Sequence, residues 1–473
     1  MKTRELVNLG VPKGEAVKAA QRAIAAVAQD MGMTRQALRA IVRAVVEDPP
    51  AFADDELWGD LAGVLTKAAA ARAGFTPRRS PAPWKQWGRN LDANAVRQLE
   101  CASMLPVAVR GALLPDAHVG YGLPIGGVLA TDNAVIPYAV GMDIACRMKM
   151  TVLDMPVSAL TGQEGRLRSA LTRETCFGVG EGFRGKNRRQ HPVMDEDWSF
   201  SRFVAGLKDK AWTQLGSSGG GNHFVEFGTL RLDTDALGLQ AGTYLALLSH
   251  SGSRGAGGGI AQHYSRLAMD LHPELPKELV HLAWLDLDSE PGAEYWEAMT
   301  LMGRYARANH ELIHRYVARH LRADVLGDIE NHHNFAWREV HDGREVVVHR
   351  KGATPAGLDA VGIIPGSMAT PAYVVRGKGS DASLHSAAHG AGRRMSRKAA
   401  MQSCTWHEAN KLLARSGVTL MSAGLDEVPM AYKDIEEVMA AQADLVEPIA
   451  RFDPKLVKMA PGRRRSKARN SKS

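Results

Sequence analysis

Histidine side chains recur in this sequence beside glycine, serine or asparagine, and these positions are the first candidates for chemistry. Three segments carry them: SSGGGNHFVEFG (217–228), LLSHSGSRGAGGG (247–259) and IENHHNFAWRE (329–339). A fourth segment, VGMDIACRM (140–148), supplies a carboxylate and a thiol. Rigid scaffolds usually present ligand-binding groups at such strand ends and turns. Taken alone, each segment also fits a structural turn.

The carboxylate of Asp143 and the thiol of Cys146 stand three residues apart, and both can reach one metal ion across a turn. The alternative for Cys146 is a small buried hydrophobe. His332 and His333 are adjacent, so on a strand they face opposite ways, and His333 is the better candidate for a ligand.

His223 and His250 complete a candidate set of one carboxylate, one thiolate and three imidazoles. Such a set suits one metal ion with open positions, or two ions bridged by the cysteine. Mixed nitrogen, oxygen and sulfur ligands favour Mn, Zn or Co over Mg, which prefers oxygen. The sequence therefore predicts a transition-metal site of unspecified identity.

Other features point to a phosphate-bearing ligand. Arg254 lies in a predicted serine- and glycine-rich loop, whose backbone N–H groups and guanidinium would suit phosphate oxygens; a flexible turn is the alternative. Asn222 can orient a phosphate or a metal ligand, and Glu226 follows it at the start of a strand-like run. The net charge of +8 favours an anionic partner such as nucleic acid.

The elements that must position these residues form an α+β pattern, with mixed sheets and surrounding helices in one catalytic core. Short apolar runs predict strands at 126–131, 243–250, 345–350 and 372–377, and helical spacing covers 296–321 and 386–416. The expected domains are an N-terminal helical segment with linker (1–84), a catalytic domain (85–460) and a basic, disordered tail (461–473).

Within the N-terminal segment, apolar periodicity predicts helices over 14–32, over 34–48 with Thr34 as its cap, and over 55–72. No run approaches the about 18 apolar residues of a membrane span, and the first residues lack the apolar core of a signal peptide. We therefore expect a cytoplasmic protein without a membrane partner.

Eight motifs, in this order along the chain, resemble those of the RtcB family of RNA ligases over residues 91–458. They are PDAHVGYGLPIGGVLAT, VGMDIACRM, GGGNHFVEFG, SHSGSRG, HHN, HRKGATPA, IIPGSMATPAYV and AAHGAGRRMSR. The resemblance implies a GTP-dependent ligase in RNA repair or tRNA splicing, with Mn²⁺, expected as two ions, in the active site. It would join an RNA 3'-phosphate or 2',3'-cyclic phosphate end to a 5'-hydroxyl end. Small activating proteins accompany some members of that family.

In the same family a histidine of the HGAGR motif attacks the α-phosphate of GTP, and that residue matches His389. A neutral imidazole is nucleophilic near pH 7, and its phosphoramidate can pass the guanylate on to RNA. The family's metal ligands match Asp143, Cys146, His223, His250 and His333. The residues that would bind GTP are Asn222, Glu226, Ser367, Gly390, Ala391, Gly392 and Lys458.

The basic residues of HRKGATPA and its surroundings would then hold phosphates of the nucleotide or RNA, the alternative being a solvated strand end. This set comprises Arg254, His349, Arg350, Lys351 and Arg393. Asp116 and His118 would assist opening of the cyclic phosphate or chemistry at the RNA 5' end, or else form a structural turn.

Two positions depart from the family pattern and suggest a divergent paralogue. Arg147 follows the metal-binding cysteine, where glycine is usual, and Ala369 replaces a common glycine. A large cation beside the metal either points away or changes substrate access. The alternatives to a ligase are a metal-dependent cyclic phosphoesterase that needs no GTP and a non-catalytic RNA-binding repair factor.

Overall fold

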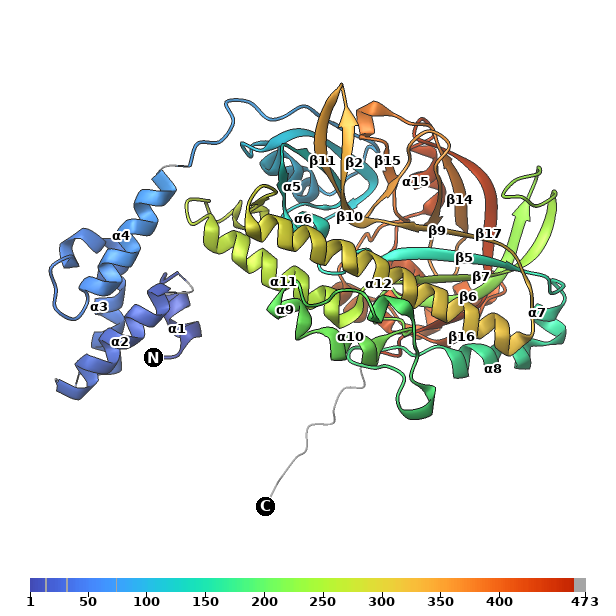
Figure 1. Ribbon diagram of the computed structural model, residues 1–473, viewed down its shortest axis with the longest axis horizontal. Helices are drawn as coiled ribbons and strands as arrows, with labels where there is room; N and C mark the ends of the chain where they lie inside the picture. Colours follow the sequence, from blue (N-terminus) through green and yellow to red (C-terminus); the bar gives the residue numbers. More distant parts are fainter. Residues whose placement is uncertain (13–14, 31–32, 74, 463–473) are drawn as a thin grey trace, which may run out of the picture. The chain divides into compact units, whose positions relative to one another are not determined.

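The computed structural model describes residues 1–12, 15–30, 33–73 and 75–462 (Figure 1). The chain divides into two compact units: one comprises residues 1–77 with 270–280, and the other residues 78–269 with the chain from 281 onward. Residues 463–473, most of the predicted basic tail, lie outside the described residues.

The first unit is helical, as the apolar periodicity predicts. Its helices are α1 (Thr3–Asn8), α2 (Glu15–Asp30), α3 (Arg35–Glu47) and α4 (Gly59–Ala73). Thr34 caps α3, its side chain accepting from the Ala37 N–H. The last helix begins at Gly59 instead of Asp55, because the Asp55 carboxylate accepts from the N–H groups of Leu57 and Trp58 and holds them in a separate turn.

The second unit contains an eight-stranded sheet in the order β13-β14-β17-β6-β7-β5-β9, with β16 paired to β17. These strands are β5 (Arg147–Leu153), β6 (Phe224–Leu232), β7 (Gly242–Ser251), β9 (Val325–His332), β13 (Val361–Pro365), β14 (Ala372–Gly377), β16 (Thr419–Ser422) and β17 (Val446–Met459). The long helix α12 (Glu290–Leu321) crosses one face of this sheet, and α8 (Glu164–Glu174) packs beside it (Figure 1).

A second sheet has five strands in the order β1-β2-β3-β11-β10. They are β1 (Trp84–Gln86), β2 (Ala108–His118), β3 (Ile125–Thr131), β10 (Asn334–His341) and β11 (Arg344–Lys351). Apolar side chains from β2, β3 and β11 share one core with residues of β14 and α15 (Ile435–Ala440), so the two sheets are packed together. The α+β class is therefore confirmed.

Two local predictions were wrong. The predicted loop after His250 becomes a helix at Arg254, the first residue of α11 (Arg254–Leu271), because small residues allow close packing: a Cβ at Gly257 would overlap Ser253. The predicted helix over 386–416 instead begins with strand β15 (Ser386–Ala388), and helices appear only at α13 (Arg397–Ser403) and α14 (Trp406–Arg415). In the part of the chain that is described, no helix is long and apolar enough to cross a bilayer.

Candidate active site

Three neighbouring strands bring the central ligand candidates together. Cys146 directly precedes β5, His250 lies in β7, and His333 directly follows β9. Because β5 is hydrogen-bonded between β7 and β9, with Arg147 opposite both Ser251 and His332, the three side chains reach the same end of the sheet. Sheet register, and not proximity in sequence, therefore builds this cluster.

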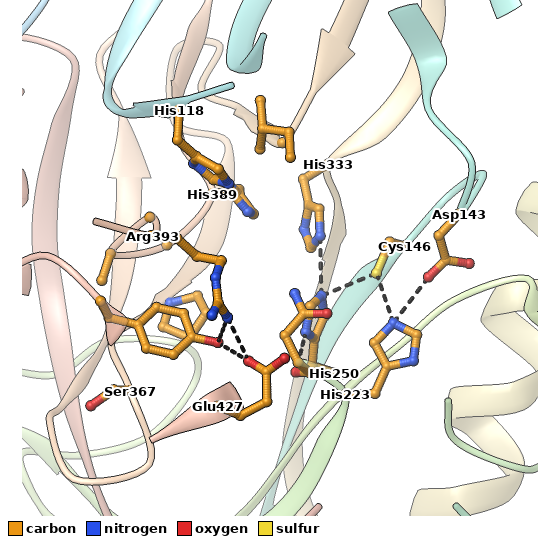
Figure 2. A pocket seen from close by; sticks show the side chains of 18 of the residues that line it. His118, Asp143, Cys146, His223, His250, His333, Ser367, His389, Arg393 and Glu427 are labelled. Carbon is orange, nitrogen blue, oxygen red and sulfur yellow. Dashed lines mark hydrogen bonds and ion pairs between the residues drawn. The ribbon is translucent and has the colours of Figure 1, made fainter. Parts of the chain in front are cut away.

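The side chains of the cluster converge at short distances in a pocket of about 990 Å³ (Figure 2). The Cys146 Sγ lies 3.1 Å from Nε2 of His250 and 3.4 Å from Nε2 of His223. The Nε2 atoms of His250 and His333 are 3.2 Å apart, and Asp143 Oδ2 lies 3.0 Å from His223 Nε2. All five predicted metal ligands therefore line one pocket.

The donor set fits a metal ion. Cys146, His223 and His250 offer donor atoms that lie within 4.8 Å of one another. Burial lowers the pKa of His250 to about 3 and also lowers the pKa of His333, so both imidazoles are neutral and offer lone pairs. Burial raises the pKa of the Cys146 thiol, and a divalent cation would offset that cost by stabilising the thiolate. The cluster could therefore bind a metal ion.

His389 lies beside this cluster, its ring centroid 5.0 Å from that of His333. Its Nδ1 is 2.6 Å from Oδ2 of Asp116, and the same oxygen accepts the His389 backbone N–H at 3.2 Å. Asp116 is completely buried in β2. With Nδ1–H donated to this carboxylate, the Nε2 atom keeps its lone pair, which is the form that a nucleophile or base requires.

His118, also from β2, occupies the same side of the pocket (Figure 2). Its Nδ1 lies 3.1 Å from the carbonyl oxygen of Asp116, and burial lowers its pKa to about 4. A second, neutral imidazole thus lies next to the hydrogen-bonded pair of His389 and Asp116.

Further predicted residues line the pocket. They are Asn222, Glu226, Lys351, Ser367, Gly390, Ala391, Gly392 and Arg393. Burial raises the pKa of Glu226 well above its usual value, which favours the protonated acid, a form that can donate a hydrogen bond. Burial lowers the pKa of Lys351 to about 7.

Besides Asp116, which contacts the lining residue His389, four predicted residues are not brought into the pocket lining. The Arg254 guanidinium donates to Ser217 Oγ and to the Gly178 carbonyl. The imidazole of His349 accepts from the Ile136 N–H and lies 3.1 Å from the Leu129 carbonyl, so protein groups satisfy both its nitrogens.

The other two are Arg350 and Lys458. Arg350 is 1% exposed and pairs with both carboxylate oxygens of Glu339, which makes it a support for β10 and β11. Lys458 donates to the Leu171 carbonyl and to Thr175 Oγ1. Its neighbours Val457 and Met459 line the pocket, and strand alternation turns Lys458 to the opposite face.

Sequence reasoning missed an acidic anchor at the pocket wall. Glu427 is 2% exposed and accepts from Arg393 at 3.0 Å; Arg397 and the Tyr432 hydroxyl also contact this carboxylate (Figure 2). Glu427 lies in a short 3₁₀ turn within LDEVPMAY, a segment without catalytic spacing, so no sequence signal marks it. It holds Arg393 in place at the edge of the pocket.

Arg147 points away from the candidate metal ligands. It is 5% exposed, lies 3.4 Å from Glu330 and donates to the Gly303 carbonyl of α12. Because successive strand residues face opposite sides, Cys146 and Arg147 diverge, and the large cation braces β5 against β9 and α12 instead of entering the pocket.

Together the fold and site define an α+β protein with a candidate metal cluster and a carboxylate-oriented histidine in one pocket. Residues 98–459 match the family model "tRNA-splicing ligase RtcB". The chain is 32% identical to the RNA-splicing ligase RtcB of Escherichia coli K12 over 78% of this chain and 95% of that protein. It is 31% identical to the tRNA-splicing ligase RtcB of Methanococcus maripaludis (74% and 87%) and 32% identical to the RNA-splicing ligase RtcB of Mycobacterium tuberculosis (76% and 98%). The chain belongs to the RtcB family.

Proposed function

We propose that this protein is a GTP- and Mn²⁺-dependent RNA ligase that joins 3'-phosphate or 2',3'-cyclic phosphate ends to 5'-hydroxyl ends. The observation that carries the proposal is the 2.6 Å contact between His389 Nδ1 and Asp116, made 5.0 Å (ring centroids) from the imidazole of His333. This arrangement leaves a nucleophilic nitrogen beside the predicted metal ligands. Family membership and the names of the related RNA-splicing ligases support the same activity.

In the first step, Nε2 of His389 attacks the α-phosphorus of GTP, the bond to the β-phosphate oxygen breaks, and pyrophosphate leaves. Asp116 holds the ring and stabilises the positive charge that the imidazole gains. A bound Mn²⁺ would supply charge neutralisation for the phosphates, held by Asp143, Cys146, His223, His250 and His333. Arg393 and Lys351, which line the pocket, would hold phosphate oxygens.

In the following steps the RNA 3'-phosphate oxygen attacks the guanylate phosphorus and the P–N bond breaks, which frees His389. The RNA 5'-hydroxyl oxygen then attacks the activated 3'-phosphate, and GMP leaves. A 2',3'-cyclic phosphate must first be opened by water to a 3'-phosphate, and His118, which lines the pocket, and the adjacent Asp116 would assist that step.

The test is intact-mass spectrometry after incubation with GTP and Mn²⁺. We expect a gain equal to one GMP, lost on acid treatment as a phosphoramidate is, and absent in His389→Ala. His385→Ala is the matched control, because this imidazole lies four residues earlier, pairs with Asp381 and does not line the pocket. Hydrolysis of a 2',3'-cyclic end without GTP and without any covalent adduct would instead favour a cyclic phosphoesterase. RNA binding with neither reaction would favour the repair factor.

A further inference from the structure

The mouth of the pocket exposes apolar side chains on the side of β2. Tyr121 is 67% exposed, Val119 47% and Met142 41%, and all three line the pocket. Large exposed hydrophobic side chains gathered at a pocket mouth mark a contact surface more often than isolated ones do. They both line the pocket and face solvent, so a ligand that extends out of the site can contact them.

The backbone that presents Tyr121 is fixed on both sides. The Gln98 amide donates to the Gly120 carbonyl at 2.6 Å and accepts from the Gly120 N–H at 3.0 Å. Gly122 has a φ of +69°, and a Cβ there would lie 2.6 Å from the His281 carbonyl. The Tyr121 carbonyl also accepts from the buried Lys351 ammonium. The exposed ring therefore stands on a rigid turn.

Two further rings surround Tyr121. The Tyr138 centroid lies 6.4 Å away and the His281 ring, at 6.1 Å, meets Tyr121 edge-on at 88°. Tyr138 also lines the pocket. The edge-on contact with His281 restrains the Tyr121 ring. Most of the Tyr121 side chain nevertheless stays exposed to solvent.

We propose that Tyr121 is a stacking platform for an unpaired base of the RNA strand whose end enters the pocket. Single-stranded nucleic acid is held by aromatic faces that stack on bases and by cations that track the backbone. Here the Lys351 ammonium donates to the Tyr121 carbonyl, and the exposed side chain of Arg394 lines the same pocket. The inference rests on the proposed function and adds a subsite to it.

The test measures equilibrium binding of short single-stranded RNAs at fixed salt, without GTP, so that no turnover occurs. One RNA has a 5'-hydroxyl end and the other a 3'-phosphate end, and each is also made with an abasic nucleotide at successive positions from that end. We expect Tyr121→Ala to weaken binding of one strand about tenfold and Tyr121→Phe to stay within about twofold of the unaltered protein. Trp406→Ala, at an exposed aromatic outside the pocket, is the matched control and should bind as the unaltered protein does.

An abasic nucleotide at the stacked position should weaken binding of the unaltered protein by a similar factor and have no further effect on Tyr121→Ala. The strand that shows this coupling is the one that passes Tyr121. Equal binding by Tyr121→Ala and the unaltered protein would overturn the inference. The inference would also be overturned if Tyr121→Ala lost RNA affinity but an abasic nucleotide caused no similar loss at any position. The covalent guanylate is assayed on separate aliquots of the same preparations, with GTP and Mn²⁺ added. If it forms while coupling is absent, only the stacking inference fails, and if it does not form, the proposed function fails.

Discussion

The carboxylate of Asp116 accepts from both the ring Nδ1 and the backbone N–H of His389, and it does so from the fully buried end of β2. Strand β2 of the five-stranded sheet thus fixes the imidazole of His389, and this imidazole faces the candidate metal ligands at the end of the eight-stranded sheet. The second oxygen, Oδ1, has no hydrogen-bond partner among the described residues, so the two hydrogen bonds that this carboxylate accepts both come from His389.

We predict that Asp116→Asn reduces the rate of covalent GMP transfer to His389 by about 100-fold or more, the range typical of a lost acid–base or orienting group. The amide cannot stabilise the imidazolium and favours the wrong tautomer. Single-turnover labelling measures the rate. Asp434→Asn is the control, because asparagine also caps a helix and α15 should keep its start. Equal rates in both variants would contradict this role for Asp116.

Removal of one ligand should abolish stabilisation by metal. A ligand at about 100 times its Kd stabilises the folded state by about 2.7 kcal/mol, so Mn²⁺ should raise the Tm of the unaltered protein and a chelator should reverse the rise. Cys146→Ala should lose most of this shift, whereas Cys404→Ala, at a buried cysteine outside the pocket, should keep it. Differential scanning calorimetry with and without Mn²⁺ tests this, and an equal shift in both variants would rule out the thiolate as a ligand.

Lys351 should make phosphate binding depend on pH. Its pKa is lowered to about 7 by burial, so its amine loses its charge as the pH rises through 7. We expect GTP affinity to fall between about pH 6 and pH 8 and this fall to be smaller in Lys351→Met. Lys398→Met, at an exposed lysine outside the pocket, should retain the slope of the unaltered protein. Fluorescence titration at constant ionic strength measures it.

The same pKa shift has a consequence for stability, with the opposite sign. The folded-state pKa of Lys351 lies below its usual value of 10.5, so the unfolded chain binds more protons between about pH 7 and 10.5. The contribution of this group to the free energy of unfolding therefore rises with pH across that window. In Lys351→Met this part of the pH dependence should disappear from urea-unfolding measurements.

Substitution of Gly392 should be costly both because its φ is positive and because a side chain there would meet β2. Comparison with Gly343 separates these two causes. Its φ is +72°, and a Cβ there would overlap the Asp116 carbonyl oxygen. Gly343 has almost the same φ, +73°, but a Cβ there would meet no atom within 4 Å. We predict that Gly343→Ala costs about 1 kcal/mol of backbone strain and Gly392→Ala clearly more, with loss of GMP labelling. Similar costs in thermal denaturation would show that the close approach to β2 is unimportant.

The sequence indicated the histidines, the cysteine and the aspartate that line the pocket more clearly than it indicated the residues that support the pocket wall. Asp143, Cys146, His223, His250 and His333 were identifiable because each adjoins a strand or turn with glycine or asparagine, and the structure brings them into one pocket. Their contact depends on the pairing of β5 with β7 and β9, which no local pattern encodes.

Basic residues were harder to assign, because a motif gives residue type but not direction. Arg350 and Lys351 are adjacent, yet Lys351 lines the pocket while Arg350 turns to Glu339 and Ser386. Strand alternation explains the difference once β11 is known. Glu427 could not be found from sequence, since its role comes from tertiary contacts with Arg393 and Arg397.

The place of β17 in the large sheet has a consequence for how the chain matures. This strand inserts between β14 and β6, although β6 precedes it by more than two hundred positions. Until residues 446–459 have been synthesised, β6 and β14 each present an unpaired edge. Open edges of this kind invite pairing with other chains. A chain in which this strand has not yet paired therefore exposes two open edges in the middle of the sheet, where pairing with other chains competes with folding.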